Sequence, residues 1–203
     1  VLLSLARWKL LGTGTFATQL NSCNIIIRTR AGLRQPDIQL MSNPVRMDAK
    51  IWFHGIGQRQ EHRVTADAVV LHPESRGWMT LRSSNPLDPP RVYVNAFGAQ
   101  ADIDCAIRGI EAARRIYSTP PQSALIAREL RPGPACTSHA DLVAFVRANG
   151  GITQHPVGTC KMGIDAEAVV DPRLRVRGID GLRVADASIM PTVTGGNTNA
   201  PTI

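Results

Sequence analysis

The sequence predicts an α+β fold in which an antiparallel sheet carries helices on one face. Two observations lead to this class: short β-prone runs fill the first half of the chain, and two segments with helical spacing follow them. A third supports a packed core, because 43% of the 203 residues are hydrophobic and 19% are charged. That usage is ordinary for a globular protein of this length and excludes a disordered chain.

The strand candidates begin after a helical or irregular lead-in over residues 2–14, which closes with two glycines. Residues 23–30 contain three consecutive isoleucines, and residues 37–40 alternate polar and apolar side chains, as a half-buried strand does. Turn-forming residues separate these runs, so we expect neighbouring strands to pair. The remaining strand candidates in this half are residues 51–56, 66–71, 77–82 and 91–97. Near the end of the chain, the β-prone runs 168–172, 174–176 and 182–188 also predict short strands.

Two helices are predicted in the middle of the chain. Residues 101–117 place Ile103, Ile107 and Ile110 at helical spacing, with Arg114 in the same series, and two prolines end the pattern. Residues 138–148 form the second candidate. Ser138 is its expected N-cap, because a serine oxygen there accepts a hydrogen bond from a backbone N–H of the first turn. The glycine pair at 150–151 then predicts a domain boundary near residues 150–152.

The chain is basic because of arginine. Lysine and arginine total 23, only Lys9, Lys50 and Lys161 are lysines, and the net charge is +7. The arginines are scattered rather than clustered, and aromatic residues make up only 4% of the chain, so few side chains are suited to stack on bases. We therefore expect no nucleic-acid partner, and a basic polyanion-binding module remains the alternative that charge alone suggests.

The cysteines and the apolar runs constrain compartment and metal content. Cys23, Cys105, Cys136 and Cys160 show no metal-ligand spacing, so we expect free thiols in a reducing compartment, with the cytoplasm favoured. His155 lies near Cys160, but zinc needs three or four ligands, and we predict no metal site. No apolar run approaches the ~20 residues of a membrane span, and the first residues do not resemble a signal peptide.

One glycine motif matches a cofactor-binding pattern by letters alone. Residues 12–17 read G-x-G-x-x-A. A dinucleotide-binding loop needs a buried strand before it, a helix after it and an acidic residue about 20 positions later. The preceding residues favour a strand poorly, no clear helix follows, and the nearest acid downstream is Asp37. We therefore do not interpret this motif as a dinucleotide site.

Three features of the last fifty residues are candidates for a role in catalysis or ligand binding. His155 stands before Pro156 and near Gly158, so it is expected in a loop that positions one imidazole, as a general base requires. Asp186 is followed by small residues, which either end a strand, with Asp186 capping the next turn, or let the backbone approach a ligand. Residues 194–202, rich in glycine and asparagine, form either a surface turn or a cradle for a ligand.

Four blocks in this region share one order and spacing: HPVGTCKMG at 155–163, AVVDP at 168–172, GLRVADASIMP at 181–191 and GGNTNAPT at 195–202. Together they resemble the C-terminal signature of the glucose-methanol-choline flavoprotein oxidoreductases. PDIQL at 36–40 and LHPESRGWMTLRSSNPLDPP at 71–90 resemble earlier segments of that family, so the likeness spans nearly the whole chain. The asparagine-rich end is more similar to the choline and alcohol dehydrogenase branch than to glucose oxidase.

The resemblance implies a domain division, a cofactor and site residues. Residues 1–151 would form the substrate-binding domain with its lead-in, and residues 152–203 the C-terminal segment of the FAD-binding domain. His155 would remove the proton of a small-molecule alcohol while hydride leaves for the flavin of FAD, and Asn199 would hydrogen-bond the substrate oxygen. The residues implied along or beside FAD are Asp186, Ala187, Asn197 and Thr202.

The sequence departs from the family where FAD would be held, since a strand followed by G-x-G-x-x-G and a helix is missing. We therefore expect residues 1–203 by themselves not to oxidise alcohol. The alternatives are the C-terminal part of an active FAD-dependent oxidoreductase, a catalytically inactive fragment that retains the signature, and the basic module named above. Neither the electron acceptor nor membrane association is indicated.

Overall fold

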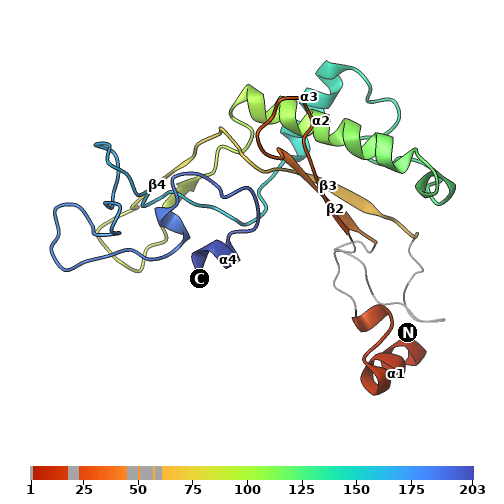
Figure 1. The fold of residues 1–203 in the computed structure, drawn as a ribbon, viewed down its shortest axis with the longest axis horizontal. Coiled ribbons are helices and arrows are strands. Elements are labelled where there is room, and N and C mark those ends of the chain that lie inside the picture. The colour runs from red at the N-terminus through yellow and green to blue at the C-terminus, as the bar shows by residue number, and fades with distance from the viewer. Residues whose placement is uncertain (1, 18–22, 45–49, 51–56, 58–60) are drawn as a thin grey trace.

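The structure is a computed structural model that describes residues 2–17, 23–44, 50, 57 and 61–203. Its centre is a sheet, with one helix across the sheet and a second helix on the far side of the first (Figure 1). The strand predicted at 51–56 lies outside the described residues. No helix among the described residues is both long and apolar enough to cross a membrane.

The main sheet has three antiparallel strands in the order β1-β2-β3. They are β1 (Cys23–Ile27), β2 (Ile38–Asn43) and β3 (Thr65–Val70). In register, Leu40 of β2 lies opposite Ile25 of β1 and Ala68 of β3. The sequence prediction of an antiparallel sheet is confirmed, and the most deeply buried strand, β2, occupies its centre.

Helix α2 (Gln100–Tyr117) covers one face of this sheet. Ile38 and Leu40 of β2 are 0% and 2% exposed and pack in one cluster with Cys105 and Ala112 of α2. A Cβ on Gly109 would lie 2.9 Å from the Cβ of Ala68, so the helix approaches the sheet this closely only because glycine stands there.

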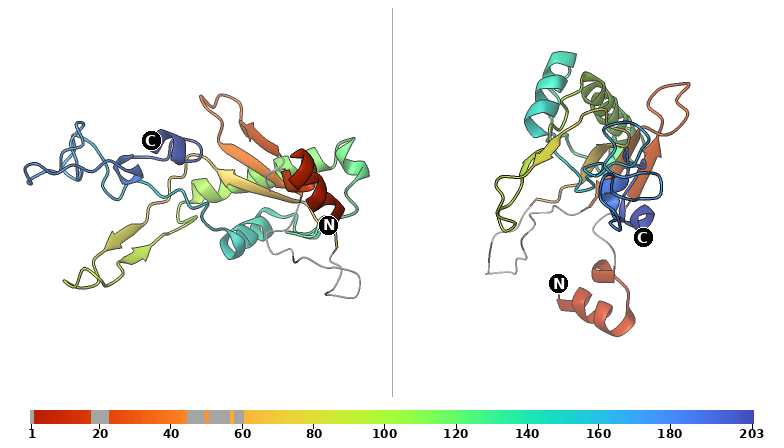
Figure 2. Two further views of the ribbon diagram at one scale, coloured as in Figure 1. Left: turned by 90° about the horizontal axis from the view of Figure 1, so that it is seen from below. Right: turned by 90° about the vertical axis from the view of Figure 1, so that its left-hand side faces the viewer.

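Helix α3 (His139–Asn149) packs on the opposite side of α2, where the apolar positions of the two helices meet. Figure 2 shows the resulting order of sheet, α2 and α3 from two further directions. The Ser138 hydroxyl accepts a hydrogen bond from the Asp141 N–H at 3.1 Å, which confirms the predicted cap.

The packing of sheet, α2 and α3 confirms the α+β class and the placement of helices on one face. The core residues shared by the helices are Ile103, Ala106, Ile107, Leu142 and Val146.

Arg114 does not belong to the apolar series in which its spacing placed it. Its guanidinium pairs with Glu129 at 3.0 Å and donates to the carbonyl oxygens of Gly133 and Cys136. These bonds hold the segment between α2 and α3 against the end of α2. The short turn η2 (Gln122–Ala124) begins that segment.

A separate hairpin is formed by β4 (Trp78–Thr80) and β5 (Arg91–Tyr93), and the rings of Trp78 and Tyr93 lie 5.6 Å apart. This hairpin and residues 152–203 extend on the left in Figure 1, whereas α1 lies on the right. The proposed division between residues 151 and 152 falls after α3, where the chain enters this extension.

The strands predicted at 168–172, 174–176 and 182–188 are wrong as regular elements. The structure has single bridges there, pairing Val170 with Met162 and Val176, and Arg175 with Arg183. Leu174 adopts a φ of 64°, and the turn glycines at 178 and 181 also have positive φ. Because the chain reverses direction at each of these positions, too few residues lie between the turns to form a regular pair of strands. The remaining short elements are η3 (Ala187–Ile189) and α4 (Asn199–Thr202).

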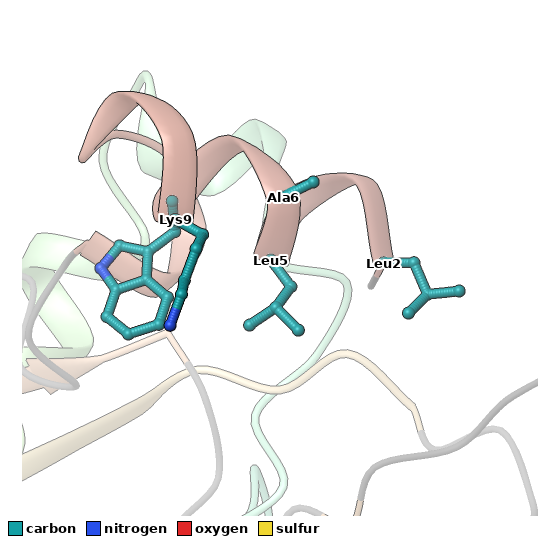
Figure 3. Close-up of a pocket in the computed structure, with 5 residues that line it drawn as sticks. Leu2, Leu5, Ala6 and Lys9 are labelled. Atoms are coloured by element: carbon teal, nitrogen blue, oxygen red, sulfur yellow. The ribbon is translucent and has the colours of Figure 1, made fainter.

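Helix α1 (Leu2–Leu11) confirms the predicted helical lead-in and has no buried residue. The glycines at 12 and 14 follow this helix and precede the short turn η1 (Thr15–Ala17), so the arrangement is not that of a dinucleotide loop. A shallow pocket runs along α1 (Figure 3) and includes none of the residues singled out above for chemistry. Its lining residues are Leu2, Leu5, Ala6, Trp8 and Lys9.

Cys105 is expected to resist alkylation in the folded chain. Burial, reinforced by the negative charge of Asp37, raises the pKa of its thiol to about 11. Because the thiolate is the nucleophile, only about one part in a thousand is reactive at pH 8. Iodoacetamide labelling followed by mass spectrometry should modify the exposed Cys23 first and Cys105 last, and urea should equalise them. Equal rates in the native chain would contradict this burial.

Candidate active site

The loop that carries His155 is fixed onto the segment that begins at Asp186. The Cys160 N–H donates to the Ser188 carbonyl at 3.0 Å, and the Met162 N–H donates to the Ile189 carbonyl at 2.8 Å. Met162 also bridges to Val170, which is completely buried. Two of the blocks identified by sequence therefore lie side by side and share backbone hydrogen bonds.

His155 lies in an irregular loop, as predicted, and its side chain is half-buried. Gln154 has a φ of 60°, and the proline at 156 restricts the residue before it to extended conformations. These neighbours leave the His155 backbone little freedom. Its Nδ1 lies 3.2 Å from the Thr198 Oγ1 and 3.5 Å from the Thr198 backbone nitrogen.

Thr198 joins the His155 loop to the glycine- and asparagine-rich block. It is 8% exposed and stands directly before α4. Its carbonyl oxygen accepts from the Thr202 N–H at 3.2 Å and from the Thr202 hydroxyl at 2.5 Å. Asn199 follows Thr198 as the first residue of α4 and is exposed, and Asn197 precedes Thr198 and is also exposed. The block is thus a turn into a helix whose buried threonine contacts His155.

Asp186 caps the turn at Ala187, as one of the two sequence interpretations expects. Its Oδ1 accepts a hydrogen bond from the Ser188 N–H at 2.8 Å. The Ser188 hydroxyl nearby and this backbone N–H lower the pKa of Asp186, which therefore stays ionised at neutral pH. Asp186 is an exposed residue, so its carboxylate lies where solvent or a ligand can approach.

The structure adds His72 to this region. A Cβ on Gly195 would lie 2.7 Å from the His72 Cε1 and 3.1 Å from its Nε2, so the imidazole lies against the Gly195 backbone. His72 follows β3 and its neighbour Leu71, which is 3% exposed. The end of the main sheet therefore contacts the loop that leads to Thr198 and Asn199.

Gly195→Ala should destabilise the folded chain by about 1–3 kcal/mol, because the residue has a φ of +76° and its new Cβ would meet His72. Gly196→Ala is the matched control, since its Cβ would meet nothing within 4 Å and its φ is ordinary. Urea unfolding of both variants measures the difference. His72→Ala in the Gly195→Ala background should recover the steric part and leave the backbone part. No recovery would show that the ring does not lie against Gly195.

Sequence reasoning missed Thr198, His72 and Ser188 as individual residues. For Thr198 a signal was present: a threonine just before a short Asn-Ala-Pro-Thr run suits a helix start, where Pro is tolerated in the first turn. No comparable signal marks His72, because its contact with Gly195 joins positions more than a hundred residues apart.

The described residues fit part of a flavin cofactor. The Ser188 Oγ is shielded from solvent, and although it lies near the Asp186 carboxylate it meets no hydrogen-bond geometry among the described residues, so this hydroxyl has capacity left to bond a ligand. The carboxylate of the exposed residue Asp186 accepts hydrogen bonds from hydroxyl groups, which suits the sugar-alcohol chain of a flavin nucleotide. Asp186 and Ser188 lie on the segment to which the His155 loop is bonded.

Much of the positive charge serves internal bonds. Arg108 pairs with Asp37, Arg175 pairs with Asp171 at 2.7 Å, and Arg177 donates to two backbone carbonyls. The guanidinium groups in these bonds already have partners within the chain. Among the described residues, no three His, Cys, Asp or Glu side chains gather as a metal site would require.

Comparison with known proteins finds choline and alcohol dehydrogenases among the curated relatives of this chain. It is 41% identical over 197 residues to an oxygen-dependent choline dehydrogenase of Burkholderia cenocepacia, covering 97% of this chain and 34% of that protein. It is 48% identical over 133 residues to an alcohol dehydrogenase [acceptor] of Pseudomonas putida, covering 66% of this chain and 24% of that protein. The chain thus spans about a third, or less, of the curated relatives it matches.

Solved structures agree with the fold. A pyridoxine 4-oxidase from Mesorbium loti superposes with a TM-score of 0.76 at 27% identity, covering 92% of this chain and 36% of that one. A formate oxidase of Aspergillus oryzae gives 0.81 at 21% identity, covering 98% and 39%, which supports the fold alone. Residues 73–203 match the sequence profile of GMC oxidoreductases, so the chain belongs to the GMC oxidoreductase family.

Proposed function

We propose that this chain forms the substrate-binding part, and a strip of the cofactor-binding part, of an FAD-dependent oxidoreductase that oxidises a small alcohol to an aldehyde. The observation that carries the proposal is the contact of His155 with Thr198, on a loop bonded to the Asp186 segment. A half-buried, oriented imidazole beside a partly fitting flavin site has the arrangement that alcohol oxidation needs.

His155 acts on the hydroxyl group of the substrate. Its Nδ1 faces Thr198, so its Nε2 is the nitrogen left to approach the alcohol oxygen and remove the proton. Asn199 follows Thr198 at the start of α4, and its amide both donates and accepts hydrogen bonds. It is suited to hold the alcohol and then the forming carbonyl. When bound, FAD would accept the hydride that leaves the carbon bearing this hydroxyl group.

The segment 186–188 would hold the cofactor. Asp186 offers its carboxylate, Ala187 begins a short turn, and Ser188 offers the hydroxyl described above. Asn197 precedes Thr198 and Thr202 bonds to it, so these two residues would shape the loop next to a bound cofactor. Thr202 does so by its two bonds to the Thr198 carbonyl. In this proposal residues 1–151 supply the sheet that faces the alcohol and residues 152–203 supply the cofactor strip.

Visible absorbance tests the cofactor part first. The purified chain is mixed with FAD, excess FAD is removed, and the flavin band of the retained fraction is recorded. Since the sequence contains no glycine-rich phosphate loop after a strand, we expect weak retention and no alcohol oxidation by residues 1–203 alone. Strong retention and turnover, lost in His155→Ala, would overturn that expectation.

The activity itself is tested in a flavin-loaded protein that contains this chain. Choline and a simple primary alcohol are added without oxygen, and bleaching of the flavin band is followed. Bleaching by either alcohol supports the proposal and begins to define the substrate class. A flavin band that no alcohol bleaches would favour the inactive-fragment alternative.

A further inference from the structure

Among the residues that the structure describes, the side-chain nitrogen Nδ1 of His155 has two hydrogen-bonding neighbours, and both belong to Thr198. The Thr198 Oγ1 lies 3.2 Å away, and the Thr198 backbone nitrogen lies 3.5 Å away. A neutral imidazole carries one proton, on either Nδ1 or Nε2, and the partner of one nitrogen decides which. Thr198 is therefore placed to choose the tautomer of His155.

The backbone N–H of Thr198 permits only one tautomer, whereas its hydroxyl can donate to an unprotonated Nδ1 or accept from a protonated one. A backbone N–H only donates, so its contact requires an Nδ1 without a proton and places the proton on Nε2. A hydroxyl oxygen can accept, so Oγ1 is able to bond an Nδ1 that carries the proton, which leaves the Nε2 lone pair free. Only this second tautomer lets His155 take a proton at Nε2, the nitrogen that does not face Thr198.

The shorter contact is the one to the hydroxyl. The N–H contact at 3.5 Å exceeds the usual length of a hydrogen bond, whereas the hydroxyl contact at 3.2 Å lies at the end of that range. Thr198 is 8% exposed, so water competes poorly for Nδ1 on this side. The carbonyl of Thr198 is bonded twice by Thr202, which holds the backbone of Thr198 in place.

We propose that Thr198 is a positioning residue whose hydroxyl accepts the Nδ1 proton of His155 and so keeps Nε2 unprotonated for its role as base. The inference rests on the proposed function, because it assumes that His155 removes a proton. Without the hydroxyl, the backbone N–H would be the remaining partner and would turn His155 into the opposite tautomer. An enzyme whose catalytic histidine is held in the wrong tautomer loses about 10⁴-fold in rate.

Nitrogen-15 NMR of histidine-labelled chain tests the tautomer directly, at a pH where the imidazole is neutral. The His155 signals are assigned by their absence from the His155→Ala spectrum. We expect the proton on Nδ1 in the unsubstituted chain and in Thr198→Ser, and on Nε2 in Thr198→Val. Thr194→Val, which alters an exposed threonine of the same block, is the control and should leave the signals unchanged.

A proton on Nε2 in the unsubstituted chain would overturn the inference, as would a Thr198→Val spectrum identical to that of the unsubstituted chain. The unsubstituted chain and the serine variant decide the matter even if the valine variant does not fold. Since this readout needs neither flavin nor alcohol, it is separate from the test of alcohol oxidation. If Nδ1 carries the proton but the protein oxidises no alcohol, the inference that Thr198 sets the tautomer of His155 stands. The proposed function alone is then contradicted.

Discussion

His155→Ala should slow alcohol-dependent flavin reduction by about 10²–10⁴-fold in a flavin-loaded protein that contains this chain, which is the usual contribution of a positioned acid or base. The reason is local: alanine removes the imidazole whose Nδ1 contacts Thr198 and leaves the alcohol proton without an acceptor. The backbone bonds from Cys160 to Ser188 and from Met162 to Ile189 do not involve the side chain of His155. Flavin retention should therefore be nearly unchanged.

The measurement is the first-order rate of flavin bleaching under anaerobic conditions at saturating alcohol. His139→Ala is the control, because this histidine lies on α3 with 67% of its side chain exposed and should leave the rate unaltered. A variant that retains flavin and bleaches at the original rate would remove His155 from the base role. Loss of flavin in the variant would instead assign His155 to the cofactor site.

Asp102→Ala should lower the free energy of unfolding by about 2–6 kcal/mol, because two backbone amides would lose their partner at about 1–3 kcal/mol each. Asp102 is 3% exposed and accepts from the Glu74 N–H and the Ser75 N–H, both at 2.8 Å, and from the Ser75 hydroxyl. The Ser75 hydroxyl oxygen also accepts from the Ala99 N–H at 3.0 Å. This carboxylate therefore fastens the loop after β3 to the first turn of α2.

Urea unfolding at neutral pH measures the loss. Asp104→Ala is a close control: it removes the same charge from the same helix, but its side chain is 42% exposed and pairs with Gln100 and His139 at the surface. We expect it to cost less than about 1 kcal/mol. Similar losses in the two variants would show that the loop does not depend on Asp102. Because the loop also carries His72, which lies against Gly195, the Asp102 variant tests whether the core supports the candidate site.

The regular elements were predictable because their signals are local. Three isoleucines and a clear alternation identified two strands of the sheet, and the spacing from Ile103 onward identified α2. The cap at Ser138 was predictable for the same reason, since it depends on residues three positions apart. The predicted strands in residues 168–188 failed because β-prone residues there are interrupted by reversals that composition does not reveal.

The fold class, the family and the blocks that contain His155, Asp186 and Asn199 were predictable without coordinates, because they follow from local pattern and from motifs with fixed spacing. The contacts of Thr198 with His155, of His72 with Gly195 and of Asp102 with a distant loop became visible when the chain was seen folded. Each of these contacts joins residues far apart along the chain, and their partners are chosen by how the sheet, the helices and the last fifty residues pack together. The order of residues along the chain does not show which distant residues this packing brings into contact.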